Sequence, residues 1–113
     1  MIAATVFARV RKIMNDPADG DERWSNDELI AELNLILRKM LHDRPFLYLG
    51  TDGVALTFTA VTTVSSEIIA TINENHLECV AAGIASRLYS NEEEDEVNIA
   101  LAKKHGATFA QGY

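Results

Sequence analysis

Hydrophobic residues recur at helical spacing in four stretches of the chain, and these stretches predict a mainly α protein. The first stretch spans residues 2–15, and its regularly spaced apolar positions are Ile2, Val6, Val10 and Ile13. Residues three and four positions apart share one face of an α-helix, so this face can be buried. Pro17 follows the stretch and cannot continue a helical hydrogen-bond ladder, so we expect a polar loop before the next element.

The second stretch, residues 26–43, begins with the clearest local signal in the sequence. Ser25 and Glu28 fit the capping-box pattern, in which each side chain accepts a hydrogen bond from the backbone N–H of the other residue. Trp24 precedes this cap, at the position from which a hydrophobic staple packs onto the first helical turn. A wide apolar stripe follows, and Pro45 ends the predicted helix.

Between residues 46 and 72 the helical spacing gives way to alternation. The apolar members of the alternating run are Val54, Leu56 and Phe58. Alternation with a period of two is typical of a half-buried strand, and Asp52-Gly53 is a hairpin turn signal. We therefore expect a four-helix bundle with a β-hairpin-rich insertion between the second and third helices. An isolated hairpin is marginal in water, so this insertion should rest on the helices or on another subunit.

The last two helical stretches differ in composition. The third spans residues 74–90 and contains Gly83, which costs a helix about 1 kcal/mol relative to alanine and is therefore expected to serve close packing. The fourth starts near residue 91 or 92 with a run of carboxylates, which favour a helix N-terminus. These acidic residues are Glu92, Glu93, Glu94, Asp95 and Glu96. Gly106 is expected to break or bend this helix, which would leave residues 106–113 as a tail.

Composition and charge narrow the class of protein. The 113 residues correspond to one domain, with 48% hydrophobic and 24% charged residues and a net charge of −7. This charge argues against a free-standing nucleic-acid binder, which would carry a basic patch. It is compatible with lining a passage through which DNA slides, because an anionic wall repels phosphates. No apolar run is long enough for a membrane helix, and the order of charges at the N-terminus does not fit a signal peptide, so we expect an intracellular protein.

Residues that could carry catalysis or bind a metal are sparse. Cys79 is the only cysteine, and its apolar neighbours predict a small buried hydrophobe. The three histidines are far apart and none lies in a metal-binding spacing, while the acidic loop after Asp16 lacks the calcium-binding pattern. The sequence also lacks a phosphate-binding glycine motif. We therefore predict that the protein is not an enzyme and has no catalytic residue, cofactor or metal site.

Several segments together resemble a known family. They are Arg23-Trp24-Ser25-Asn26-Asp27-Glu28-Leu29, then Arg38 to Arg44-Pro45, then Ser86-Arg87-Leu88-Tyr89-Ser90, and finally Ala100-Leu101-Ala102-Lys103-Lys104-His105. Their order, with a β-rich section in the middle, resembles the small head-to-tail adaptor proteins of tailed bacteriophages, also called head completion or connector proteins.

The resemblance implies a structural protein that forms a homo-oligomeric ring beneath the portal, twelvefold like the portal itself. The ring would join the portal to the tail nozzle or another tail component and would continue the DNA channel, with DNA only as passing cargo and no membrane contact. The protein would be assembled in the host cytoplasm and reside in the virion, at the head–tail interface.

The same resemblance suggests which residues make contacts. Aromatic side chains are favoured as buried anchors at interfaces. The candidates for portal or subunit contacts are Trp24, Tyr48, Phe58, Phe109 and Tyr113. The acidic residues 92–96 are candidates for a surface that faces the channel or a partner.

Two other classes of function stay open on the sequence alone. One is a small acidic regulatory or antitoxin-like module that binds another protein. The other is an enzyme or metal-binding module built on a helical bundle, which is disfavoured because the chain contains no Glu-x-x-His pair of the kind that binds metals between facing helices.

Overall fold

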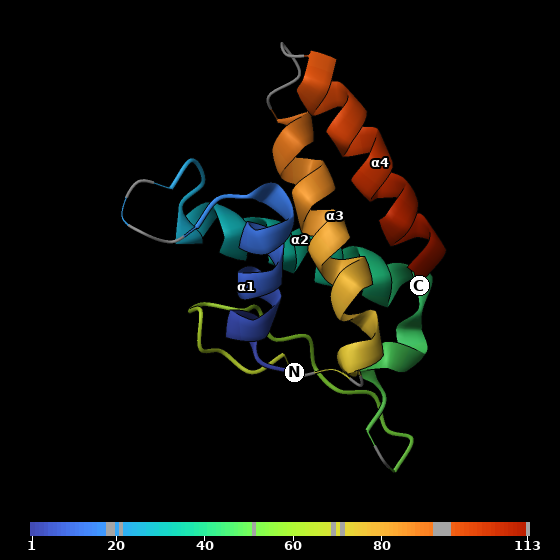
Figure 1. The fold of residues 1–113 in the computed structure, drawn as a ribbon. Helices are drawn as coiled ribbons and strands as arrows, with labels where there is room; N and C mark the ends of the chain where they lie inside the picture. Colours follow the sequence, from blue (N-terminus) through green and yellow to red (C-terminus); the bar gives the residue numbers. More distant parts are fainter. Residues whose placement is uncertain are drawn as a thin grey trace.

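Four α-helices and two short 3-10 helices make up the regular structure of the described residues (Figure 1). The computed structural model describes residues 1–17, 20, 22–50, 52–68, 70, 72–91 and 96–112. The elements are α1 (Ala3–Met14), α2 (Asn26–Asp43), η1 (Pro45–Tyr48), η2 (Glu74–His76), α3 (Leu77–Ser90) and α4 (Glu96–Gly112). The prediction of four helices is confirmed, and the bounds of α2 agree with those expected from its pattern.

The start of α2 has the capping geometry that its sequence predicts. The backbone N–H of Glu28 donates to Ser25 Oγ at 3.2 Å, and the N–H of Ser25 donates to Glu28 Oε1 at 3.3 Å. Each side chain thus satisfies a backbone donor that the first turn of a helix leaves open. Trp24, immediately before the cap, is buried in the same hydrophobic core as Leu29.

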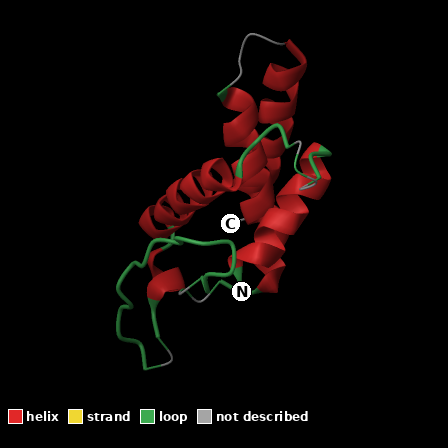
Figure 2. Cartoon of the chain, turned by 90° about the vertical axis from the view of Figure 1, so that its left-hand side faces the viewer, coloured by secondary structure: helices red, strands yellow, loops and turns green. Residues whose placement is uncertain are grey.

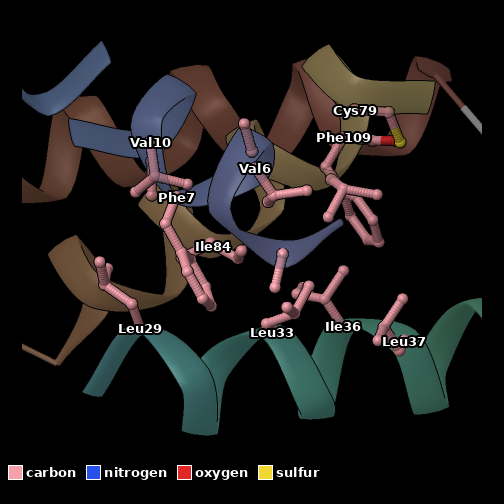
Figure 3. Close-up of a cluster of buried hydrophobic side chains, with 14 of the residues drawn as sticks. Val6, Phe7, Val10, Leu29, Leu33, Ile36, Leu37, Cys79, Ile84 and Phe109 are labelled. Carbon is pink, nitrogen blue, oxygen red and sulfur yellow. The ribbon is translucent and has the colours of Figure 1, made fainter. Parts of the chain in front are cut away.

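Helix α3 lies at the centre of the core and packs against each of the other three α-helices (Figure 1). Figure 3 shows side chains of α1, α2 and α3 meeting in one cluster. The largest fully buried side chains are Val6 and Val10 from α1, Leu29, Leu33, Leu37 and Met40 from α2, and Val80, Ile84 and Leu88 from α3. Burying a side chain of this size contributes about 1.5–3 kcal/mol before conformational entropy is subtracted.

Helices α3 and α4 approach closely because small residues lie between them. A Cβ atom added at Gly83 would lie 2.8 Å from Phe109 Cδ2 and 2.9 Å from Ile36 Cδ1, so glycine is the residue that fits. A Cβ atom at Gly112 would lie 2.6 Å from Cys79 Cβ. The expected packing role of Gly83 is therefore confirmed, and Cys79 lies on a buried helix face as predicted.

The C-terminal end of the chain differs from the prediction. We expected Gly106 to interrupt the last helix and residues 106–113 to form a tail, whereas α4 continues to Gly112. The physical reason is tertiary: the Phe109 ring is buried against α3, and the Cys79 thiol donates a hydrogen bond to the Phe109 carbonyl at 3.3 Å. These contacts offset the weak helix propensity of glycine. Residue 113 lies outside the described residues.

The β-hairpin-rich insertion expected over residues 46–72 is wrong for the part of this segment that the structure describes. Figure 2 shows the segment as loops, and its described residues form no strand beyond two isolated bridges, Leu49 with Ala55 and Ile2 with Glu67. Pro45 instead begins η1, in which the adjacent residues Leu47 and Tyr48 are both buried. Two consecutive buried residues suit a helical turn and not a pleated strand, so residues 54–59 find only the single bridge between Ala55 and Leu49 beside them.

Candidate interaction surface

The segment between η1 and Val61 projects from the helical part of the molecule. We call residues 49–60 the arm; residue 51 within it lies outside the described residues. Both views show the arm extending beyond the helices at the end of the molecule where the N-terminus lies (Figures 1 and 2). The chain reverses near the tip of the arm, where Gly53 has a φ of +78° and its N–H donates to the Gly50 carbonyl at 3.0 Å. The expected turn at Asp52-Gly53 is thus present.

The arm exposes apolar side chains and carries almost no charge. Val54 is 63% exposed and Leu56 is 38% exposed, and Phe46 beside the arm is 59% exposed. Residues 53–66 contain no Asp, Glu, Lys, Arg or His, although the chain as a whole has a net charge of −7. Exposed apolar groups that cluster on one segment are typical of a protein contact surface, whereas single exposed residues are not.

Two contacts of Phe58, one with Tyr48 of η1 and one with Arg38 of α2, attach the arm to the helices. The Phe58 ring lies 5.9 Å from the Tyr48 ring, measured between centroids, and the Arg38 guanidinium lies 5.0 Å from the Phe58 centroid. A cation over an aromatic face at a partly exposed site contributes about 0.5–1 kcal/mol. Phe58 is half-buried as a result, so one part of its ring faces the helices and another part remains at the surface.

Asn34 of α2 holds the chain where the arm ends. Its Nδ2 donates to the Val61 carbonyl at 2.9 Å, and the Val61 N–H donates to Asn34 Oδ1 at 2.7 Å. One side-chain amide thus satisfies both backbone groups of a residue that is 2% exposed, as a neighbouring strand would do. From Thr57 to Ala60, in contrast, the backbone has no hydrogen-bond partner within the described part of the chain.

Three of the aromatic residues predicted as contacts are buried within the chain and do not lie at its surface. Trp24 and Tyr48 are each 3% exposed and Phe109 is 7% exposed, so their rings are covered by the chain itself. The Trp24 ring meets the Tyr89 ring edge to face, with centroids 5.5 Å apart. Phe58 alone among the four described aromatic candidates reaches the surface. Tyr113 lies outside the described residues.

The acidic candidates cannot be placed in the same way. Residues 92–95 and the side chain of Glu96 lie outside the described residues, between the end of α3 at Ser90 and the start of α4. Their assignment to a channel-facing or partner-facing surface stays a prediction.

A buried polar cluster, which sequence reasoning missed, fixes the loop that carries Trp24. Arg11 Nη1 donates to Asp16 Oδ2 at 3.1 Å, and the Asp16 carboxylate accepts the backbone N–H groups of Arg23 at 2.8 Å and Trp24 at 3.1 Å. Both members of the ion pair are 8% exposed. The Arg11 guanidinium therefore joins α1 to Asp16 and, through the Trp24 carbonyl at 3.1 Å, to the start of α2. The carboxylate directly after the helix was the signal that pointed to this pairing.

A second polar cluster joins α2 to α3. Glu32 is 8% exposed, and its carboxylate accepts hydrogen bonds from Arg87 Nε and, at 3.2 Å, from Asn91 Nδ2. The sequence carried a signal for this site, because Glu32 interrupts the apolar face of α2 beside Leu33. A carboxylate on a buried face needs partners of this kind. In both polar clusters, the charged side chains find their hydrogen-bond partners within the cluster. The clusters therefore orient the helices from which these side chains come.

The titratable groups with shifted pKa values also belong to the core. Burial raises the pKa of the Cys79 thiol to about 11, so the thiol is protonated at neutral pH and is a poor nucleophile. Burial, with a smaller effect of Lys104, lowers the pKa of His105, whose ring stacks on Tyr89 at 5.9 Å. Among the described residues, no group of three or more His, Cys, Asp or Glu side chains is arranged to hold a metal ion.

Comparisons with known proteins do not assign this chain to a family. No family model, no curated protein and no solved structure matches it. None of the described helices combines the length and the apolar character that a membrane-spanning segment needs. The fold and surface therefore define a helical domain with buried polar clusters and one projecting arm that carries a single charged residue, Asp52.

Proposed function

We propose that this protein is a structural head-to-tail adaptor of a tailed bacteriophage. In this proposal, copies of the chain form a ring beneath the portal, join the portal to a tail component such as the tail nozzle, and continue the DNA channel. The protein acts by shape and contact and has no enzymatic activity. It resides in the virion at the head–tail interface.

The observation that carries the proposal is the order and character of the elements. A first helix is followed by Trp24 and the Ser25 cap of α2, a long segment with only two short 3-10 helices separates α2 from α3, and α3 ends at Ser90 before the alanine-containing α4. This is the order of helices that the resemblance to the adaptor family implies, although the β-rich section that it also implies is not seen in the described residues. The correction of the β-rich section to an extended arm leaves the positions of the four helices in that order unchanged.

The arm supports the same proposal. An adaptor needs a surface through which it meets other proteins, and the arm offers exposed apolar groups at one end of a molecule that measures 46 × 29 × 19 Å. The burial of Trp24, Tyr48 and Phe109 within the chain places more weight on the arm as a contact surface. A surface of net negative charge also suits a component that DNA passes without adhering.

The proposal is tested by mixing the purified chain with the portal protein of the phage that encodes it. We expect a complex of defined mass, seen by sedimentation and by electron cryomicroscopy, with the chain forming a ring on one face of the portal. As a genetic test, phage that lack this chain should accumulate filled heads without tails, and supply of the chain should restore tailed particles.

Specific outcomes would contradict the proposal. A chain that stays separate from the portal, combined with normal tailed particles in its absence, would exclude the adaptor function. Stable binding to one regulatory partner, or release of repression in cells, would instead support the small acidic binding module as the function.

A further inference from the structure

We propose that residues 54–60 of the arm pair, backbone to backbone, with the same segment of a second copy of this chain. The pairing lies between copies and not within one chain. This inference names the contact through which copies meet in the proposed ring, and it rests on the proposed function only for the size of the final assembly.

The backbone of residues 57–60 has hydrogen-bonding groups that are open to pairing. From Thr57 to Ala60, no N–H or C=O group has a hydrogen-bond partner within the described part of the chain, and Thr57, Thr59 and Ala60 are exposed. Such a row of open donors and acceptors is a template for another extended segment. Asn34 satisfies the backbone of Val61 next to this row, so the open stretch ends at a fixed point.

The side chains of residues 54–60 have the pattern of a β-strand. Residues 54–60 alternate apolar and small or hydroxyl side chains, and β-branched and aromatic residues such as Val54, Thr57 and Phe58 are those that strands favour. Within the chain this pattern obtains one bridge, between Leu49 and Ala55, because η1 replaces the strand that would have lain beside it. Beyond this bridge, the strand-forming preference of the segment is unused within the described part of the chain.

The charge distribution favours a second copy of this chain as the partner of the arm. Two copies of a chain with a net charge of −7 repel each other over most of their surfaces, and residues 53–66 form the longest stretch where neither copy presents a charge. A partner of different charge would be recognised by complementary charges, which this stretch does not offer. Identical segments with a period of two can also pair with each other, which permits a contact between identical subunits.

The geometry also permits more than two copies. In an extended segment, the N–H and C=O groups of successive residues point to opposite sides. Val54 C=O and Leu56 N–H already bond within the chain to Gly50 and Tyr48, whereas the backbone of residues 57–60 has no hydrogen-bond partner on either side within the described part of the chain. Residues 57–60 can therefore have a neighbouring copy on both sides. Repetition of one such contact gives a closed ring when the rotation between copies closes, and this is compatible with the proposed function.

The test uses the full chain and measures its mass against concentration by sedimentation equilibrium. The wild-type chain should associate as concentration rises. Val54→Lys places like charges in the paired segment and should weaken association by about tenfold or more, which corresponds to about 1.4 kcal/mol. Val97→Lys is the matched control, because Val97 of α4 has the same 63% exposure as Val54 and receives the same charge. It should associate as the wild type does.

A second pair of variants separates backbone pairing from side-chain contact. Thr59→Pro removes an N–H group that has no hydrogen-bond partner among the described residues, whereas Thr59→Ala keeps it. Thr59→Pro should weaken association and Thr59→Ala should not. In addition, the Thr57 and Thr59 amides should exchange hydrogen rapidly at low concentration and become protected on association. Circular dichroism checks that each variant is folded.

The outcomes distinguish this inference from the proposed function. A wild-type chain that stays monomeric at every concentration overturns the pairing, even if it binds the portal. Arm variants that associate normally but lose the portal also overturn it, because the arm then contacts another protein. A chain that pairs through its arm but fails to join the portal leaves the pairing intact and contradicts the adaptor function.

Discussion

The α3–α4 pair and the arm use their side chains in opposite ways. Along α3 and α4, small residues let the helices approach until Phe109 contacts Gly83, and the buried side chains find their partners within the chain. Along the arm, Val54 and Leu56 remain exposed and the backbone of residues 57–60 has no partner in the described chain. The comparison teaches that one domain can combine a core whose side chains pack on one another with a segment whose backbone and apolar side chains have few partners within the described chain.

The same contrast applies to polar groups. Glu32 is buried with the side chains of Arg87 and Asn91 around it, so its charge orients α2 against α3. Residues 53–66, by comparison, avoid charge altogether while remaining largely at the surface. Charge is thus placed where it fixes the fold and omitted where we propose that copies meet. The following predictions test this division, beginning with the largest expected effect.

The largest difference should appear between two leucines, one in the core and one in the arm. Leu33 is 0% exposed and Leu56 is 38% exposed. Leu33→Ala should lower the free energy of unfolding by about 3 kcal/mol, because it removes buried surface and leaves a cavity. Leu56→Ala should change it by less than about 0.5 kcal/mol. Urea denaturation of the dilute chain measures both. Equal losses in the two variants would mean that the arm is part of the core.

The attachment of the arm to α2 should have an intermediate effect. Asn34→Ala leaves the N–H and C=O groups of Val61 without their partner and should cost about 1–2 kcal/mol. The amide of Val61 should then exchange hydrogen faster, and the arm should be cut more readily by a protease. Asn75→Ala, at an exposed position, is the control and should leave both measurements unchanged. Unchanged exchange at Val61 in Asn34→Ala would contradict the role of this side chain.

Close packing of α3 on α4 should make two glycines respond with opposite signs. Alanine is favoured over glycine in a helix by about 1 kcal/mol. At Gly83 the added methyl group would overlap Phe109 and Ile36, so Gly83→Ala should be destabilising by about 1 kcal/mol overall. At Gly106 the nearest atom is Ser86 Oγ at 3.1 Å, which can shift slightly, so Gly106→Ala should be neutral or stabilising. Thermal unfolding of both variants would reveal the sign, and stabilisation by Gly83→Ala would refute the packing argument.

The smallest expected effect concerns pH. Burial, and secondarily Lys104, lowers the pKa of His105 in the folded chain below its ordinary value of 6.5. The unfolded chain therefore binds the proton first, so the stability due to neutral His105 is complete above that ordinary value and is lost as pH falls through the folded pKa. His105→Gln should show less loss of stability between neutral and mildly acidic pH than the wild type. An identical pH dependence would indicate that other groups dominate.

The comparison also shows how far sequence reasoning reaches. The four helices, the Ser25 cap and the packing role of Gly83 followed from spacing and local chemistry, and the structure agrees with them. The β-hairpin-rich insertion did not follow, because Pro45 and the paired burial of Leu47 and Tyr48 turned the first expected strand into η1. The polar partners of Arg11 and Glu32 were also missed, since they come from separate elements that a local pattern does not connect.

For the candidate surface, the sequence alone predicted less than it did for the fold. Aromatic character alone selected Trp24, Tyr48 and Phe109 as contacts, but each ring is buried within its own chain. Whether an aromatic side chain faces a partner or the core depends on which elements fold against it. Exposure of Val54 and Leu56, and the open backbone beside them, became visible only once the helices were in place.

The amino-acid sequence by itself determined where α2 begins, which helix faces are apolar and which segment is free of charge, because capping, spacing and charge are local properties. Tertiary structure decided that α4 runs through Gly106, that the strand-like arm finds almost no partner, and that the predicted aromatic contacts are buried. These outcomes depend on contacts between residues far apart in the chain, whose free energy can exceed the local preferences of any single segment.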